Sequence, residues 1–141
     1  MKKLLLTLLL TTSLSTFALD LDFLFGSFCY KSPKVQDRGG VWYLPNQQEP
    51  FTGENLCVYV NGQYHSKGNI LNGLRDGKWT WWYENGQKLE EANYKDGKIN
   101  GKWTWWNENS QIMAEVNYKD GKEDGKWTMW YENGQIKSEV N

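Results

Sequence analysis

The sequence predicts an all-β protein, an elongated single sheet of stacked β-hairpins with an N-terminal cap. A tryptophan-rich run begins at Gly77 and recurs at Gly101 and Gly125, which gives a period of 24 residues. A fixed period of this length is typical of repeat architectures, in which one small unit stacks on the next. Aromatic runs alternate with turn signals such as Asn85-Gly86 and Asp96-Gly97, and this pattern predicts hairpins.

The first 18 residues have the pattern of a secretory signal peptide. Lys2 and Lys3 precede the apolar stretch 4–10, and small residues lead up to Ala18. We therefore expect cleavage near Ala18 and export to the periplasm or the extracellular space. The alternative is an uncleaved N-terminal anchor, although the apolar stretch is too short to span a bilayer as a helix.

Residues 19–52 differ from the repeats, and we expect them to form the N-terminal cap. Residues 19–30 are apolar and aromatic, and residues 41–44 resemble a short strand that follows Gly39-Gly40 and ends at Pro45. Repeat arrays need atypical ends that shield the stacked core.

The two cysteines, Cys29 and Cys57, are expected to form a disulfide that ties the cap to the first repeat. Export would place them in an oxidising compartment. The bond would close a loop of about 28 residues and stabilise the fold by roughly 3–4 kcal/mol. The alternative is two separate thiols. We expect no metal site, because His65 is the only histidine and no CxxC spacing occurs.

The repeat region spans residues 53–141. A glycine every 24 residues, from Gly53 onward, divides it into a degenerate unit (53–76), two full units (77–100 and 101–124) and a partial unit (125–141).

Each unit reads as a hairpin whose two strands flank an Asn-Gly pair. Asn and Gly tolerate the positive φ angles of a type I′ turn, so we expect such a turn at Asn85-Gly86 and at its equivalents. Asn109-Ser110 replaces this pair in one unit, and we expect that turn to be the most strained or mobile. The Asp-Gly pairs are expected to link one hairpin to the next.

This register divides the side chains between two faces. The more apolar face is predicted to be the core. It would carry Trp79, Trp81, Tyr83, Ala92 and Tyr94, with the row Trp79, Trp103 and Trp127 at its centre, and Ile112 and Ile136 at the position of Lys88. The other face would carry Thr80, Trp82, Leu89, Glu91 and Asn93. A β-bulge near Trp81-Trp82 would exchange these assignments.

The spaced pattern Gly-x-Trp-x-x-Trp/Tyr-x-x-Asn-Gly followed by Tyr-Lys-Asp-Gly resembles the MORN-repeat family, in its bacterial YwqK-type antitoxin-like variant. The resemblance covers about residues 39–141. It implies hairpins stacked into an elongated, twisted sheet that serves as a scaffold or contact surface. The antitoxin label implies neutralisation of a partner protein, which fits poorly with export. The departures from the pattern are Met129 for Trp, Asn107 for an aromatic residue and Ser110 for Gly.

The charge balance argues against nucleic-acid and lipid-headgroup binding. Loss of Lys2 and Lys3 leaves 14 basic and 17 acidic residues, a formal charge of −3. Binding to phosphates requires clustered Lys and Arg, and anionic lipids attract basic segments. We expect no nucleic-acid partner and no cofactor.

The sequence offers little catalytic material, and we expect a protein that is not an enzyme. His65 lies in a polar segment, typical of a surface histidine, and a Cys57–His65 pair would lose its thiol to the expected disulfide. Glu91, Glu115 and Glu139 recur at the repeat period. Glycosidase chemistry needs two carboxylates in different environments, so we interpret these glutamates as a solvated row beside Lys78, Lys102 and Lys126.

The candidate binding residues are Trp82, Trp106 and Trp130, which equivalent positions in stacked hairpins place in one row. Exposed Trp and Tyr supply much of the binding energy at interfaces. The leading prediction is an envelope module that binds a partner protein. The alternatives are a carbohydrate or peptidoglycan module using the same row, an antitoxin-like neutraliser, and a hydrolase. A second interpretation is that all these rings fill a thin core. We also expect self-association through the edge of the C-terminal hairpin.

Overall fold

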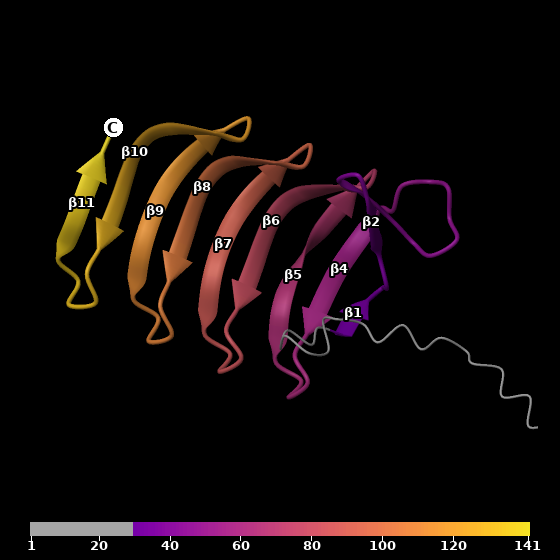
Figure 1. The fold of residues 1–141 in the computed structure, drawn as a ribbon, viewed down its shortest axis with the longest axis horizontal. Coiled ribbons are helices and arrows are strands. Elements are labelled where there is room, and N and C mark those ends of the chain that lie inside the picture. The colour runs from indigo at the N-terminus through magenta and orange to yellow at the C-terminus, as the bar shows by residue number, and fades with distance from the viewer. Residues whose placement is uncertain (1–29) are drawn as a thin grey trace, which may run out of the picture.

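The computed structural model describes residues 30–141 and confirms the predicted fold class (Figure 1). Nine strands of the described region form one antiparallel sheet in the order β1-β4-β5-β6-β7-β8-β9-β10-β11, and β2 and β3 form a separate hairpin. The strands are β1 (Tyr30–Ser32), β2 (Gln36–Arg38), β3 (Val41–Tyr43), β4 (Gly53–Val58), β5 (Tyr64–Leu71), β6 (Leu74–Trp82), β7 (Lys88–Lys95), β8 (Lys98–Trp106), β9 (Ile112–Lys119), β10 (Lys122–Trp130) and β11 (Ile136–Val140). The expected signal peptide and Cys29 lie outside the described residues. The described part of the chain contains no helix with the length and hydrophobicity of a membrane span.

The sheet is a meander in which each repeat adds two strands. From β4 onward, each strand pairs with the next strand along the chain, so consecutive hairpins lie side by side (Figure 1). β6, β8 and β10 begin at Leu74, Lys98 and Lys122, which are 24 residues apart. The period of the sequence is therefore the period of the sheet.

Between the repeat strands β5 to β10, type I′ turns join the strands at one end of the sheet. Asp96 and Gly97 have φ angles of 50° and 77°, and Lys95 pairs directly with Lys98. Asn72-Gly73 and Asp120-Gly121 have the same geometry. All three pairs are tight two-residue hairpin turns. The sequence predicted that the two Asp-Gly pairs among them would be links between hairpins.

The predicted type I′ turn at Asn85-Gly86 is wrong. Gly86 has a φ of 84°, whereas Asn85 does not have a positive φ. The Tyr83 amide donates to the Gln87 carbonyl (2.8 Å), and the Gly86 amide donates to the Tyr83 carbonyl (2.9 Å). This is a three-residue loop that closes with a glycine bulge. The Asn85 side chain accepts a hydrogen bond from the Gln87 amide (2.9 Å), which holds Asn85 in this local conformation.

The loop changes the register of the following strand. Trp79 pairs with Ala92 and Trp81 with Glu90, as the sequence predicted, but Trp82 pairs with Lys88 because a bulge lies between these pairs. Trp106 pairs with Ile112 and Trp130 with Ile136 in the same way. The assignment of Ile112 and Ile136 to the Trp79 face is therefore wrong, and both lie beside the Trp82-type residues.

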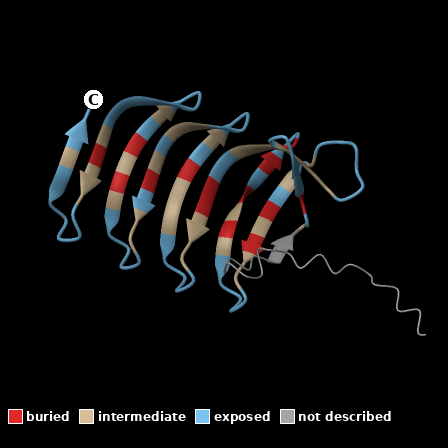
Figure 2. Ribbon diagram, in the orientation of Figure 1, coloured by how far each residue is buried: buried red, intermediate tan, exposed pale blue. Residues whose placement is uncertain are grey.

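Buried residues lie along the middle of the strands, whereas the turns are exposed (Figure 2). On the Trp79 face, the indole of Trp79 is 1% exposed. It packs against Trp81 at 5.7 Å and against Trp42 of the β2–β3 hairpin at 6.5 Å between ring centroids. It also covers Gly68, where a Cβ would lie 2.2 Å from the indole. Only glycine fits at that position.

Burial on the Trp79 face decreases away from the cap. Trp103 and Trp127 are half-buried, and Trp105 is 38% exposed. Of the predicted core row Trp79, Trp103 and Trp127, only Trp79 is fully buried. The β2–β3 hairpin supplies a second layer over Trp79, whose ring it contacts through Trp42.

Candidate functional site

The predicted binding residues lie in one continuous row across the Trp82 face. The row, which we call the Trp82 row, crosses β5 to β11 and consists of Tyr64, Trp82, Lys88, Trp106, Ile112, Trp130 and Ile136. The three tryptophans lie on every second strand, about 10 Å apart. Lys88, Ile112 and Ile136 fill the strands between or beside them.

The members of the row contact one another or pair across strands. The rings of Tyr64 and Trp82 are 5.6 Å apart between centroids, and Lys88 Nζ lies 5.3 Å from the centroid of Trp106. Trp82, Trp106 and Trp130 are half-buried. Tyr64 is 48%, Ile112 38% and Ile136 55% exposed. The row therefore presents to solvent an apolar stripe with partly accessible indoles.

Hydrogen bonds between adjacent loops fix the spacing of the row. The Tyr59 hydroxyl donates to the Trp82 carbonyl (2.8 Å), and the Tyr83 hydroxyl donates to the Trp106 carbonyl (2.9 Å). Asn107 stands where the next tyrosine would be, and its amide donates instead to Gln111 within its own loop (3.1 Å). The row is thus anchored at Trp82 and Trp106, and this contact is missing at Trp130.

A polar strip runs beside the row on the same face. Thr80, Thr104 and Thr128 are buried at its centre, and lysine–glutamate ion pairs lie over them. The pairs are Lys67–Glu54 (3.1 Å), Lys78–Glu91 (2.9 Å), Lys102–Glu115 (2.8 Å) and Lys126–Glu139. The repeated glutamates are therefore neutralised partners of lysines, as the sequence indicated.

The ion pairs govern the electrostatics of Glu91. Burial acts to raise its pKa, but hydrogen bonds from Lys88 and Lys78 and the attraction of both ammonium groups outweigh this effect. The pKa of Glu91 is therefore lower than its ordinary value, and the carboxylate stays ionised.

A hollow of about 470 Å³ lies at the C-terminal end of the row. Its lining comes from the last two hairpins: Met113, Trp130, Tyr131, Glu132, Asn133 and Lys137. Lys137 Nζ lies 5.8 Å from the centroid of Tyr131. Trp130 therefore borders a recess as well as the apolar stripe.

The opposite face holds two charged residues that the sequence analysis missed. Arg75 lies among aromatic rings, with its guanidinium carbon 4.9 Å from the centroid of Trp79 and 5.3 Å from that of Tyr94. Glu90 pairs with both Trp81 and Trp105. Both residues could have been noticed in the sequence because they break the repeat. The position of Arg75 is occupied by Ile99 and Glu123 in later units, and the position of Glu90 by Ala114 and Ser138.

The described residues show no cluster of three or more His, Cys, Asp or Glu side chains suited to a metal ion. His65 contacts the ring of Tyr59 edge-on at 4.9 Å. Cys57 is buried in β4. Its expected partner Cys29 lies outside the described region, so the disulfide stays a prediction.

Three consecutive segments, 75–96, 99–120 and 123–141, match the family model described as MORN repeat variant. A comparison with curated proteins found no match. Among solved structures, the chain is similar to the structure described as "Crystal Structure of TarM", with 10% identity, a TM-score of 0.40, and coverage of 82% of this chain and 21% of that chain. It is also similar to "Crystal structure of GtfA/B complex bound to UDP and GlcNAc", with 12% identity, a TM-score of 0.34, and coverage of 70% and 25%. The chain thus spans a quarter or less of the length of these two chains. The segments of β6–β11 that match this family model suggest a repeat-based binding module.

Proposed function

We propose that the protein is an exported, non-catalytic module of the cell envelope that binds a partner protein through the Trp82 row. The observation that carries this proposal is the shifted register, which places Ile112 and Ile136 beside Trp106 and Trp130 on a solvent-facing side. Interfaces are centred on buried aromatic anchors surrounded by a polar rim. The Trp82 row and the adjacent strip of ion pairs have this composition.

The envelope location in this proposal depends on export of the protein. It rests on residues 2–18, which have the charge and hydrophobicity of a signal peptide. Mass spectrometry of the protein recovered from cells is expected to find Leu19 as the first residue. A protein that retains Met1 and stays in the cytoplasm contradicts export without affecting the binding surface.

The binding surface is tested by site-specific photocrosslinking in the cells of origin. A photoreactive amino acid at position 112 is expected to give one discrete crosslinked product with a partner protein. The same group at Lys119, on the turn edge of the sheet, is the matched control and is expected to give none. Replacing Trp82, Trp106 and Trp130 together with Ser is expected to abolish the product. Recovery of the same product from the triple variant would falsify the assignment of the row.

Two other functions use the same surface. A carbohydrate or peptidoglycan module would stack sugar rings on the indoles, and a glycan array would then show binding that is lost on Trp106→Ala. An antitoxin-like role, which the resemblance to YwqK-type proteins implies, would give a crosslinked product whose partner is a toxin inhibited by the purified module.

A further inference from the structure

The β6–β7 hairpin shows how the Trp79 face holds a guanidinium group. The Arg75 guanidinium carbon lies 4.9 Å from the ring centroid of Trp79, 5.5 Å from that of Trp81 and 5.7 Å from that of Trp42. Its Nη1 donates to the Tyr94 hydroxyl at 3.3 Å. Cations over aromatic faces are stabilised by the ring quadrupole, and the planar guanidinium also stacks.

The next hairpin, β8–β9, has counterparts of three of these four rings, without Trp42 and without the arginine. One period of 24 residues moves Trp79, Trp81 and Tyr94 to Trp103, Trp105 and Tyr118. Arg75 moves to Ile99, whose apolar side chain cannot supply the charge. Trp103 and Tyr118 are half-buried and Trp105 is 38% exposed. These rings therefore have no internal cation and are accessible from solvent.

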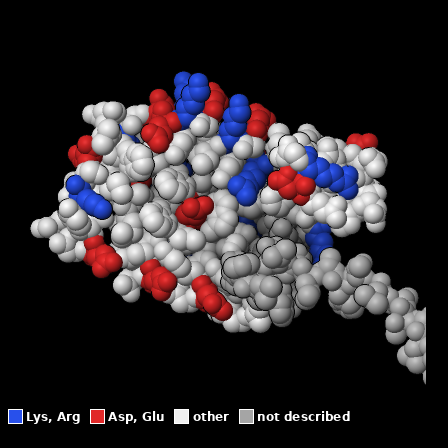
Figure 3. Space-filling view, in the orientation of Figure 1, with Lys and Arg blue, Asp and Glu red and all other residues white. Residues whose placement is uncertain are grey.

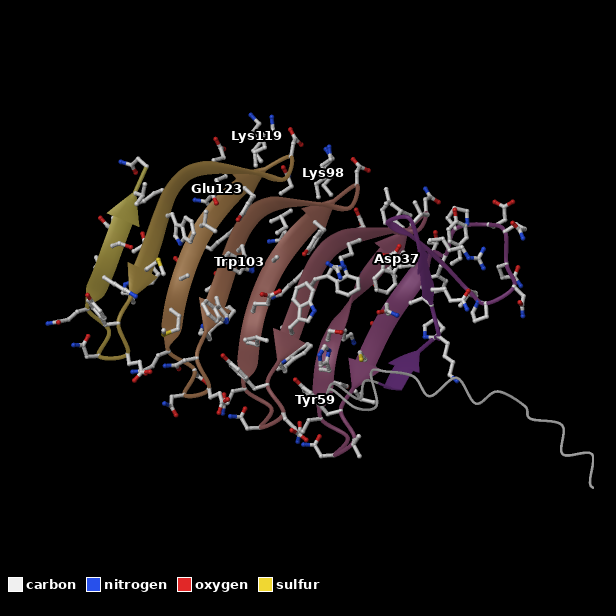
Figure 4. The ribbon with its side chains drawn as sticks, viewed as in Figure 1. Asp37, Tyr59, Lys98, Trp103, Lys119 and Glu123 are labelled. Atoms are coloured by element: carbon white, nitrogen blue, oxygen red, sulfur yellow. The ribbon has the colours of Figure 1, made fainter. Side chains whose placement is uncertain are left out.

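Two carboxylates flank this second set of rings. Glu90 on β7 lies opposite Trp105, and Glu123 on β10 lies opposite Tyr118. The Trp103 indole acts on Glu90 as a hydrogen-bond donor. Figure 4 shows Trp103 on β8 and Glu123 on β10, while Lys98 and Lys119 project from the turn edge of the sheet. Glu90 thus borders Trp105, and Glu123 borders Tyr118 three strands away from Glu90.

Neither of these carboxylates has a basic partner within ion-pair distance in the described structure. Glu54, Glu91, Glu115 and Glu139 all form ion pairs with lysines on the other face, whereas no described lysine or arginine pairs with Glu90 or Glu123. Burial raises the pKa of Glu90, although the Trp103 hydrogen bond and the charge of Arg75 act in the opposite direction. Figure 3 shows the charged side chains gathered mainly along the edges of the face in view. The unpaired carboxylates provide charge complementarity for an incoming cation.

We propose that Trp103, Trp105 and Tyr118, together with Glu90, bind an arginine side chain of a partner protein. The rings would stack on the guanidinium plane as Trp79, Trp81 and Tyr94 stack on Arg75. Glu90, directly opposite Trp105, would neutralise the charge, and Glu123, opposite Tyr118, would add to the negative potential from farther away. This site lies on the face opposite the Trp82 row and does not depend on the function proposed above.

The proposal is tested with a blocked glycine–arginine–glycine tripeptide titrated into the isotope-labelled mature protein. The NMR signals of the Trp103 and Trp105 indole N–H groups are expected to shift and saturate at millimolar peptide, because one exposed cation–π site binds weakly. The corresponding citrulline tripeptide, which has the same shape without the charge, is expected not to bind. Equal shifts with citrulline, or no shift with arginine, would overturn the proposal.

Substitutions inside and outside the site locate it. Glu90→Gln is expected to weaken binding by about threefold to tenfold, and Glu123→Gln, whose carboxylate lies farther from the guanidinium, by about twofold or less. Ile99→Arg is expected to abolish binding by supplying an internal guanidinium, and Ile99→Met is its matched control that still binds. An unchanged Trp79 indole signal verifies that each variant is folded. Unchanged binding by Ile99→Arg contradicts the site, and unchanged binding by Trp106→Ser separates it from the Trp82 row.

Discussion

Glu90 and Glu91 are neighbours in β7 whose carboxylates lie on opposite faces of the sheet. Glu91 pairs with Lys78 and Lys88, each at 2.9 Å, and its pKa is lowered. Glu90 is half-buried among tryptophans, and burial raises its pKa. A raised carboxyl pKa means that ionisation of Glu90 destabilises the folded state, whereas ionisation of Glu91 stabilises it.

The two glutamates are therefore expected to give pH effects of opposite sign. At neutral pH, Glu90→Gln raises the free energy of unfolding by less than about 1 kcal/mol after solvent screening, and Glu91→Gln lowers it by about 0.5–1 kcal/mol. The Glu90 effect fades as the pH falls through the raised pKa to the ordinary carboxyl value, because the folded wild type then binds the proton. The Glu91 effect fades between the ordinary value and the lowered pKa. Denaturant titrations at pH 7 and pH 3 measure both, and effects of the same sign at pH 7 would contradict the assignment.

The sequence could identify the repeated residues but not the role of those that break the repeat. Trp79, Trp103 and Trp127 were found because a period marks them. Arg75 stands where later units have Ile99 and Glu123, and Glu90 stands where they have Ala114 and Ser138. The roles of Arg75 and Glu90 depend on the rings around them. Those contacts also depend on Trp42, which lies outside the repeat and whose position over Trp79 no periodicity encodes.

Within one hairpin, the loop that joins the strands decides which face each side chain takes. The sequence predicted a two-residue loop at Asn85-Gly86, but Asn85 bonds to Gln87 and the loop holds three residues. An Asn-Gly pair is compatible with both the two-residue and the three-residue loop. The choice between these loops depends on the twist of the strands and on contacts between neighbouring loops. The Asn61 amide donates to the Glu84 carbonyl of the next loop at 3.0 Å, for example. This is why the strands were predictable and the position of Ile112 was not.

The β8–β9 loop carries backbone strain at Ser110. Its φ of 61° matches a position that is glycine in the other units, such as Gly134 with a φ of 80°. A side chain in this region costs about 1 kcal/mol, which agrees with the strain that the sequence predicted for this turn.

Ser110→Gly is therefore expected to raise the free energy of unfolding by about 0.5 kcal/mol. Relief of strain outweighs the added chain entropy of glycine in the unfolded state and the loss of the Ser110 hydrogen bond to Gln87. The reciprocal variant Gly134→Ser, at a site with open space around it, is expected to lower stability by about 1 kcal/mol. Chemical denaturation of the two variants measures both changes in the free energy of unfolding. A stabilising effect of Gly134→Ser would show that φ is not the cause.

Across the whole sheet, the cap and the repeats contribute to burial in different ways. Each hairpin contacts only its sequence neighbours, so the stability of the array is the sum of units and interfaces. The β2–β3 hairpin adds a second layer over the first repeat, where Trp42 contacts Trp79 and Arg75. Further contacts fix its position, because the Trp42 amide donates to the Gly73 carbonyl at 2.8 Å and its carbonyl accepts from the Phe51 amide at 2.8 Å. The cap end is therefore expected to be the most protected part of the described sheet.

Trp42→Ala is expected to remove this local protection without unfolding the distant hairpins. Loss of a half-buried indole lowers the free energy of unfolding by about 2 kcal/mol, and hydrogen exchange is expected to accelerate in β5 and β6 far more than in β9 and β10. The effect stays local because coupling between repeats passes only through neighbouring interfaces. Tyr43→Ala is the matched control from the same strand, since Tyr43 stacks on Arg38 of the cap itself (4.7 Å). It is expected to cost less than about 1 kcal/mol. Equal acceleration of hydrogen exchange in all hairpins would mean that the sheet unfolds as one cooperative unit. The decrease in burial from Trp79 to Trp103 and Trp127 would then not correspond to a decrease in local stability.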